Sequence, residues 1–282
     1  MFNYLATEYT SLFSYLNLFN YITFRTGGAI LTALFFSLIF GNTLINYLSS
    51  FQPIGQPLKE EGPTWHIIEK SGTPTMGGVL ILSSILISVF IWSDLSNIFI
   101  WITILAIISF GIIGLIDDYK KINKNNNKGL SASTRIILQI FFSLIIVFFI
   151  YYFLPKEINT EISFPFFKNL IFDLGIFFIP FGIFLIIGSA NSVNLTDGLD
   201  GLATGLVSIS ILVFGAIAYI SGRVDFSNYL NIIYIPGSGE LFVFCMAVVG
   251  ACIGFLWYNA YPASVFMGDT GSLSLGAALG TL

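Results

Sequence analysis

Charged residues are scarce in this chain. Asp, Glu, Lys and Arg make up 9% of its 282 residues, whereas hydrophobic residues make up 56%. Soluble globular domains carry about a quarter charged residues, so this composition excludes an ordinary soluble fold. The mean hydropathy of +0.88 agrees with that exclusion. We therefore expect an integral membrane protein.

Histidine and cysteine are also rare, with one His and two Cys. His66 lies in a polar loop and could donate a hydrogen bond to phosphate, although a single loop histidine is more often solvated or structural. Cys245 and Cys252 are seven residues apart in one apolar run, which places them on a similar helix face. We interpret them as buried apolar thiols.

Long apolar runs dominate the rest of the sequence. Seven are interpreted as complete helical spans across roughly 30 Å of hydrocarbon, at a rise of 1.5 Å per residue. They are Ala29 to Tyr47, Gly77 to Trp92, Ile98 to Ile116, Ile136 to Phe153, Phe172 to Ala190, Leu202 to Ile220 and Leu241 to Tyr258. An eighth run starts near Leu273 and reaches Leu282 after only about ten residues, too few to cross. We expect an all-α polytopic membrane helix bundle that forms one domain over residues 1–282, with a C-terminal truncation in the eighth span.

The distribution of Lys and Arg in short loops predicts the orientation of such a protein. If every span crosses, one side receives seven basic residues: Lys59, Lys70, Lys120, Lys121, Lys124, Lys128 and Arg135. The other side receives four: Arg25, Lys156, Lys168 and Arg223. The richer side is predicted to be cytoplasmic, which leaves the N-terminus outside.

Carboxylates recur at the ends of apolar runs on the predicted cytoplasmic side. Asp117 and Asp118 close one run, Asp197 and Asp200 precede another, and Asp269 precedes the eighth. Desolvation of a carboxylate at a membrane boundary is costly, so this recurrence suggests one site for cations or phosphates.

The residue types at that site favour phosphate chemistry. Joining two phosphate-bearing substrates requires charge neutralisation, which Mg²⁺ held by a carboxylate can provide. Asp269 precedes Thr-Gly-Ser at a predicted helix entrance, where it suits a metal ligand and where free amides favour phosphate. The alternative is that Asp269 or Ser272 only caps that helix.

Asp117 and Asp118 are adjacent, so their side chains point about 100° apart on a helix. Two roles are therefore predicted. One carboxylate would orient or deprotonate a phosphate, and the other would hold metal or pair with Lys120 or Lys121. The alternative is a solvated helix end.

Three further patterns fit a nucleotide substrate. Asn194, Asp197 and Asp200 recur every three residues, on one helical face if that segment is helical, where they could bind a pyrimidine edge and a ribose. Phe266 could stack on the base, the alternative being lipid or core contact. The glycine-rich segments Gly72 to Gly78 and Gly198 to Gly205 would let backbone amides approach an anion.

These motifs together resemble the phospho-N-acetylmuramoyl-pentapeptide transferases, bacterial enzymes that make the first lipid-linked intermediate of peptidoglycan. The pattern Thr73 to Gly78 is specific for this family, and the Asp-Asp pair is shared with the wider polyprenyl-phosphate N-acetylhexosamine-1-phosphate transferase superfamily. The matching stretches run in family order: Tyr21 to Arg25, Gly55 to Pro57, Gly62 to Pro63 with His66, Gly72 to Gly78, Asp117 to Tyr119, Asn194 to Ala203 and Phe266 to Leu273.

The resemblance implies Mg²⁺-dependent transfer of phospho-N-acetylmuramoyl-pentapeptide from its UDP carrier to undecaprenyl phosphate, which gives lipid I and UMP. Such enzymes serve cell wall biogenesis, cell shape and cell division. They are homodimers of ten-span subunits in the bacterial inner membrane, with the active site facing the cytoplasm. The implied partners are the UDP-linked substrate, undecaprenyl phosphate and the lipid bilayer, and no nucleic acid.

The resemblance also implies roles for individual residues. Asp269 would be the metal-linked carboxylate, Asp117 the base toward the lipid phosphate, and Asp118 a further essential residue. The uridine-diphosphate end would be surrounded by Lys70, Thr75, Asn194, Asp197, Gly198, Leu199, Asp200, Asn259 and Phe266. The chain also departs from the family, since it ends before a histidine-rich loop. After the Gly-Leu pair of the third cytoplasmic loop, the family usually has an Arg and a Lys. This chain has Ser133 and Arg135 there instead.

Other functions remain open from the sequence. A related transferase for N-acetylglucosamine-1-phosphate would use the same metal chemistry, but the pattern Thr73 to Gly78 argues against it. An ion or proton transporter would place carboxylates in mid-span rather than at span ends. The chain could also be an inactive fragment.

Overall fold

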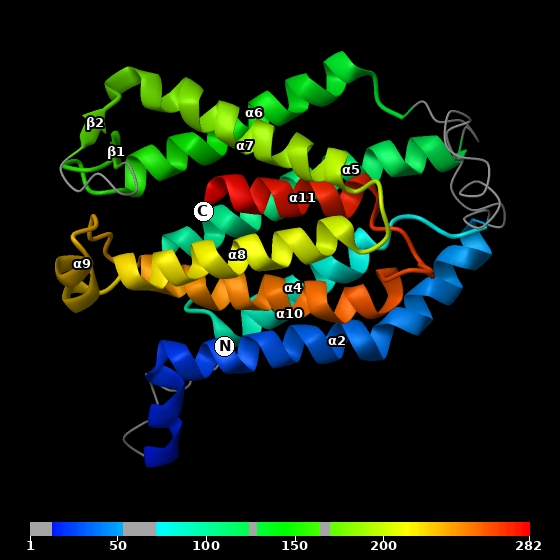
Figure 1. The fold of residues 1–282 in the computed structure, drawn as a ribbon, viewed down its shortest axis with the longest axis horizontal. Coiled ribbons are helices and arrows are strands. Elements are labelled where there is room, and N and C mark those ends of the chain that lie inside the picture. The colour runs from blue at the N-terminus through cyan, green and yellow to red at the C-terminus, as the bar shows by residue number, and fades with distance from the viewer. Residues whose placement is uncertain (1–12, 53–71, 124–128, 164–169) are drawn as a thin grey trace.

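A computed structural model describes residues 13–52, 72–123, 129–163 and 170–282, and these residues form a helical bundle (Figure 1). The helices are η1 (Ser14–Asn20), α2 (Ile22–Phe51), α4 (Gly78–Trp92), α5 (Ile98–Asn123), α6 (Ala132–Phe153), η2 (Gly175–Phe177), α7 (Phe178–Thr196), α8 (Leu202–Ser221), α9 (Val224–Leu230), η3 (Ser238–Glu240), α10 (Leu241–Asn259) and α11 (Gly268–Thr281). Strands β1 (Glu161–Ser163) and β2 (Ile171–Asp173) form an antiparallel hairpin in which Ile162 lies opposite Phe172. The described residues therefore confirm the all-α fold class.

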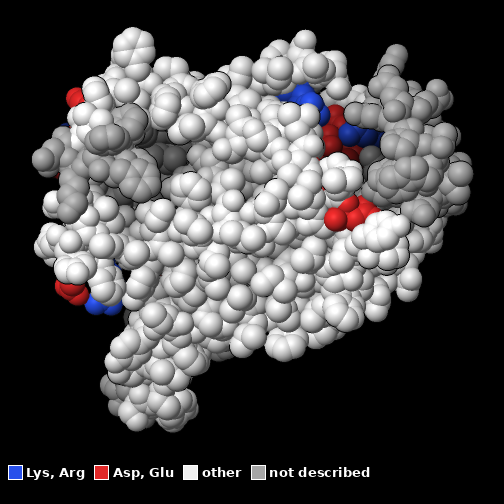
Figure 2. Space-filling model, in the orientation of Figure 1, with Lys and Arg blue, Asp and Glu red and all other residues white. Residues whose placement is uncertain are grey.

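Six of the described helices are long and apolar enough to cross a membrane: α2, α5, α6, α7 with η2, α8 and α10. Helix α4 is shorter, at 15 residues, and α11 has 14. On the face shown in Figure 2, the middle of the molecule is free of charged side chains, which gather at its two ends. Such a belt is what a hydrocarbon environment requires, so this is a polytopic membrane protein.

The core lies around α10, α5 and α11. Within their apolar windows α10 is 67% buried and α5 is 61% buried, whereas the other candidate spans are at most 28% buried. Helix α10 packs against α2, α4 and α8, and α11 packs against α5 and α7. Cys245 and Cys252 are buried free thiols in α10, as predicted.

The predicted span from Phe172 to Ala190 begins too early. Phe172 belongs to strand β2, and the helix starts only at Phe178 and continues to Thr196. Asp173 causes the turn between them, because its carboxylate accepts hydrogen bonds from the Thr160 hydroxyl at 2.6 Å and the Gly175 amide at 2.8 Å. The apolar run therefore includes part of a hairpin.

Arg25 does not lie in a loop, as the orientation argument assumed. It lies inside α2 and is 3% exposed. Its guanidinium donates to Glu240 Oε2 at 2.7 Å and to the Trp92 carbonyl at 3.3 Å. The buried pair joins α2 to η3, and the contact with Trp92 joins α2 to the end of α4. Arg25 therefore carries no information about orientation.

Candidate active site

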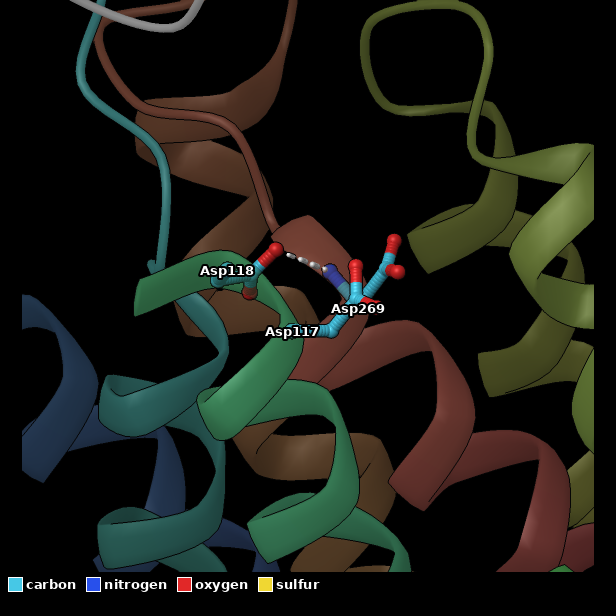
Figure 3. Close-up of side chains that lie close together, drawn as sticks. All are labelled: Asp117, Asp118 and Asp269. Carbon is cyan, nitrogen blue, oxygen red and sulfur yellow. Dashed lines mark hydrogen bonds between the residues drawn. The ribbon is translucent and has the colours of Figure 1, made fainter. Parts of the chain in front are cut away.

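Three carboxylates from two helices meet at one end of the bundle. Asp117 and Asp118 lie near the C-terminal end of α5, and Asp269 lies in the first turn of α11 (Figure 3). One oxygen from each carboxylate lies within 4.8 Å of the others. Gly114 allows this approach, because a Cβ atom there would lie 2.2 Å from the Asp269 carbonyl oxygen.

Asp118 caps helix α11 from outside that helix. Its carboxylate accepts hydrogen bonds from the amides of Asp269 at 3.1 Å and Thr270 at 3.0 Å, and from the Thr270 hydroxyl at 2.8 Å. Amides in the first turn of a helix lack partners within the helix, so a carboxylate there satisfies them. The prediction that these amides are free for phosphate is therefore wrong, as is the alternative that Asp269 or Ser272 provides the cap.

Gly268 makes the entry to α11 possible. Its φ of 73° lies in the left-handed region that favours glycine. A Cβ atom there would lie 2.6 Å from Asp118 Oδ2 and 2.7 Å from Thr75 Oγ1. Thr75 and Asp118 thus flank Gly268, which brings one predicted substrate-binding residue next to the carboxylates.

Asp117 has a different set of neighbours. One carboxylate oxygen accepts a hydrogen bond from the Leu130 amide at 2.7 Å, and the other lies 2.7 Å from Lys121 Nζ. Both Asp117 and Asp118 are at most 2% exposed. The alternative of a solvated helix end is therefore wrong, and the two carboxylates have different partners.

The Asp269 side chain points away from its own helix toward α5, α6 and α7. It accepts hydrogen bonds from Lys121 Nζ at 3.0 Å and Asn194 Nδ2 at 2.8 Å, and Arg135 Nη1 lies 3.4 Å away. Burial raises the pKa of this carboxyl, but the charge of Lys121 and the hydrogen bonds lower the pKa by more. The net direction is downward, so Asp269 is held ionised.

Lys121 contacts all three carboxylates. Its ammonium lies 2.7 Å from Asp117, 3.0 Å from Asp269 and 4.0 Å from Asp118. The positive charge of the Lys121 ammonium is thus close to every carboxylate of the cluster. Mg²⁺ prefers carboxylate oxygens as ligands, so these donors fit that ion. Asp269, the predicted metal ligand, is also the most exposed of the three side chains, at 14%.

The turn between α7 and α8 lies at the same end of the bundle (Figure 1). It contains Asp197, Gly198, Leu199 and Asp200, of which Asp200 accepts a hydrogen bond from the Ala263 amide at 3.2 Å. Helix α7 ends at Thr196 and α8 starts after Gly201, whose φ is 75°. Asn194, Asp197 and Asp200 therefore do not share a helical face, because the chain leaves the helix between the first and the second.

Asn259 is the last residue of α10, and Phe266 lies in the loop between α10 and α11. Asn259 is buried, and its side chain accepts from the Gly201 amide and the Thr204 hydroxyl and donates to the Val265 carbonyl. Phe266 is half-buried. The side chain of Asn259 thus holds the α7–α8 turn against the loop that leads to Asp269.

Three amides of the glycine-rich segment after residue 71 are already paired within the protein. The amide of Thr75 donates to Gln52 Oε1, that of Gly77 to the Phe266 carbonyl and that of Gly78 to the Met267 carbonyl. This loop pairs with the segment before Gly268 instead of binding an anion through those amides. Lys70 and His66 lie outside the described residues.

Two cations at the site are not predicted from the sequence. The sequence predicts Lys121 only as a partner of Asp117 or Asp118, and Arg135 occupies a position where the resembling family has Lys. Arg135 lies in the first turn of α6, after the Ser131 cap. A cation immediately before a long apolar run was the signal available in the sequence.

Comparison with known proteins supplies independent evidence. The model of glycosyl transferase family 4 matches residues 100–282, and the phospho-N-acetylmuramoyl-pentapeptide-transferase signature 1 matches residues 70–82. A phospho-N-acetylmuramoyl-pentapeptide-transferase of Thermodesulfovibrio yellowstonii is 52% identical over 95% of this chain and 73% of its own length. Proteins with the same name from Pelagibacter ubique, 50% identical over 99% and 77%, and Rickettsia felis, 52% identical over 94% and 73%, match similarly. The matched regions contain Asp117, Asp118 and Asp269.

Proposed function

This chain belongs to the phospho-N-acetylmuramoyl-pentapeptide-transferase family, and from that premise we propose how its carboxylate cluster performs the transfer. The enzyme moves phospho-N-acetylmuramoyl-pentapeptide from its UDP carrier to undecaprenyl phosphate, a step of peptidoglycan synthesis. The observation that carries the mechanism is the meeting of Asp117, Asp118 and Asp269 around Lys121 at one end of an apolar bundle.

We propose that Asp269 holds Mg²⁺, with Asp117 and Asp118 within reach of it. The ion, when bound, neutralises charge on the diphosphate of the nucleotide. Asp269 suits this role because its carboxylate is held ionised and is only partly enclosed. Asn194 and Arg135 bind its two oxygens and thereby fix its orientation.

Asp117 is assigned as the base toward the lipid phosphate. A phosphate monoester has a second pKa of about 6, so a neighbouring carboxylate can accept the remaining proton. An oxygen of undecaprenyl phosphate then attacks the phosphorus that carries the sugar, and the bond from that phosphorus to UMP breaks. A new diphosphate forms on the lipid, and UMP leaves.

Asp118 acts in a different way from Asp117 in this proposal. Its carboxylate, which belongs to α5, binds the first amides of α11 and thereby fixes the position of Asp269 in the first turn of α11. Lys121 and Arg135 provide positive charge for the phosphate oxygens of the two substrates. The cluster thus combines one base, one metal ligand, one anchoring carboxylate and two cations.

The nucleotide would bind beside the cluster. We propose that Lys70, Thr75, Asn194, Asp197, Gly198, Leu199, Asp200, Asn259 and Phe266 surround its uridine-diphosphate end. Three observations support this: Asn194 contacts Asp269, Thr75 flanks Gly268 together with Asp118, and Asn259 joins the α7–α8 turn to the loop before α11. Phe266 would stack on the uracil.

We further propose that the protein works as a homodimer in the bacterial inner membrane with this site facing the cytoplasm. The charge-free belt supports the location, since it matches the hydrocarbon region. By sequence, six of the eight Lys residues fall on the side predicted to be cytoplasmic, the side to which the same argument assigns the carboxylates, and this favours that orientation.

The test is UMP release by the protein reconstituted in vesicles that contain undecaprenyl phosphate. UDP-N-acetylmuramoyl-pentapeptide and UDP-N-acetylglucosamine are supplied separately, with Mg²⁺ or with EDTA. We expect UMP only from the muramoyl nucleotide and only with Mg²⁺. UMP release from UDP-N-acetylglucosamine and not from the muramoyl nucleotide would contradict the substrate assignment. Undiminished UMP release in EDTA would refute the proposed dependence on Mg²⁺.

A further inference from the structure

Helices α6 and α7 carry a polar contact inside their apolar segments. Asn191 Nδ2 of α7 donates to Gln139 Oε1 of α6 at 2.9 Å, and Gln139 is completely buried. The same Asn191 amide also donates to the carbonyl of Ile187 in its own helix. Polar side chains within membrane-spanning helices are costly, and those that occur commonly join helices through hydrogen bonds.

This contact lies one helical turn from the candidate active site on both helices. Gln139 follows Arg135 by four residues in α6, and Asn191 precedes Asn194 by three residues in α7, so each pair shares a helix face. Arg135 Nη1 lies 3.4 Å from Asp269 Oδ2, and Asn194 Nδ2 lies 2.8 Å from Asp269 Oδ1. The two helices therefore meet at one carboxylate and are joined again one turn further along.

Packing alone does not account for a glutamine at this position. Gln139 Nε2 is buried and has no hydrogen-bond partner among the described residues. A buried donor without a partner lowers stability, and a leucine of similar size would avoid that cost. The glutamine is better explained by what its oxygen does, which is to bind α7 beside the active site.

We propose that the Gln139–Asn191 hydrogen bond is a positioning contact for catalysis: it fixes α6 against α7 so that Arg135 and Asn194 meet the two oxygens of Asp269. The inference rests on the proposed function, because that function gives Asp269 its role as metal-linked carboxylate. A small displacement of a positioned group lowers the rate of the chemical step more than it lowers substrate binding. Gln139 and Asn191 are positioning residues, since neither contacts Asp269 directly.

The test compares Gln139→Leu and Asn191→Leu with a matched control. Each Leu variant is expected to lower kcat by about tenfold and to change KM for the nucleotide by less than about twofold. The exchange Gln139→Asn with Asn191→Gln keeps one amide on each helix and is expected to restore most of kcat. Ser143→Ala is the control, because Ser143 is buried one turn further along α6 and its hydroxyl has no partner among the described residues.

A second measurement does not depend on turnover. Mg²⁺ that binds the folded protein raises its unfolding temperature. This rise is expected in wild type, Ser143→Ala and the exchanged pair, and it is expected to shrink in both Leu variants. Wild-type protein that shows the rise without UMP release would refute the proposed function but leave the positioning testable through the Mg²⁺ shift.

Three results would overturn the inference. One is a Leu variant with wild-type kcat and a wild-type Mg²⁺ shift. Another is a Ser143→Ala control that loses as much kcat as Gln139→Leu. The third is an exchanged pair that stays as impaired as the single variants, since that would assign the loss to general packing.

Discussion

Asp117 and Asp118 are neighbours in the chain but bind different parts of the molecule. A helix turns about 100° per residue, and this rotation directs Asp118 to α11 and Asp117 to Lys121 and the Leu130 amide. The sequence predicted two roles from this rotation. It could not predict the partners of Asp118, because they lie 151 residues and more further along the chain and depend on how α11 packs on α5.

Replacing Asp118 by Asn tests its structural role. Asn has only one acceptor oxygen, so it cannot satisfy both α11 amides and the Thr270 hydroxyl as the carboxylate does. Asp118→Asn is expected to lower the free energy of unfolding by about 1–3 kcal/mol. Thermal unfolding in detergent measures this, with Asp225→Asn as the control because Asp225 is exposed and pairs only with Arg223 among the described residues. Equal unfolding temperatures for the two variants would contradict the capping role.

The glycine-rich loop shows where residue patterns mislead. Gly77 and Gly78 suggested amides free to bind an anion, but those amides donate to the Phe266 and Met267 carbonyls. Glycine permits close approach of any group, and the sequence does not say whether that group is a phosphate or another segment of the chain. Here it is the segment that leads to Asp269.

The length of an apolar run depends only on consecutive residues, so the positions of the helices could be predicted well from the sequence. Each predicted run overlaps an α-helix of the structure, and the clear error is the start of α7, where an apolar hairpin strand precedes the helix. The contact between α5 and α11 was not predictable in the same way. It depends on Gly114, where the backbone of α11 takes the place of a side chain.

A methyl group at Gly114 tests this contact between elements. Gly114→Ala would place Cβ 2.2 Å from the Asp269 carbonyl, so α11 must shift. The variant is expected to lose about 1–3 kcal/mol of stability and to release UMP more slowly, because Asp269 moves away from Asp117. Gly188→Ala is the matched control, since a Cβ atom at Gly188 in α7 meets nothing within 4 Å. Its stability should stay the same or rise by up to about 1 kcal/mol. A Gly114→Ala protein that matches this control would contradict the close approach.

At the scale of the whole molecule, the face drawn in Figure 2 carries its charged side chains at the two ends, with an apolar belt between them. The carboxylate cluster occupies one end, and α9 and the β-hairpin occupy the other (Figure 1). Composition was enough to predict a membrane protein, because burying so many apolar residues in a soluble fold is not feasible. Orientation was less accessible, as Arg25 shows: a charge that appears to belong to a loop can be buried inside a helix.

Labelling of single cysteines tests the orientation. Lys120 and Asp225 are exposed at opposite ends of the bundle, and the native Cys245 and Cys252 are buried and do not compete. A membrane-impermeant maleimide is expected to label Asp225→Cys in intact spheroplasts and Lys120→Cys only after permeabilisation. The reverse pattern would place the carboxylate cluster outside the cytoplasm.

The central claim is that Asp117 and Asp269 perform Mg²⁺-dependent phosphoryl transfer at the end of the bundle. The most direct test measures the rate of UMP release from UDP-N-acetylmuramoyl-pentapeptide by wild type, Asp117→Asn, Asp269→Asn and the exposed control Asp225→Asn, each folded to the same extent in vesicles with undecaprenyl phosphate and Mg²⁺. We expect the first two variants to lose at least about a hundredfold in kcat, while the control keeps the wild-type rate. Wild-type turnover in Asp117→Asn and Asp269→Asn would contradict the assignment of catalysis to these carboxylates.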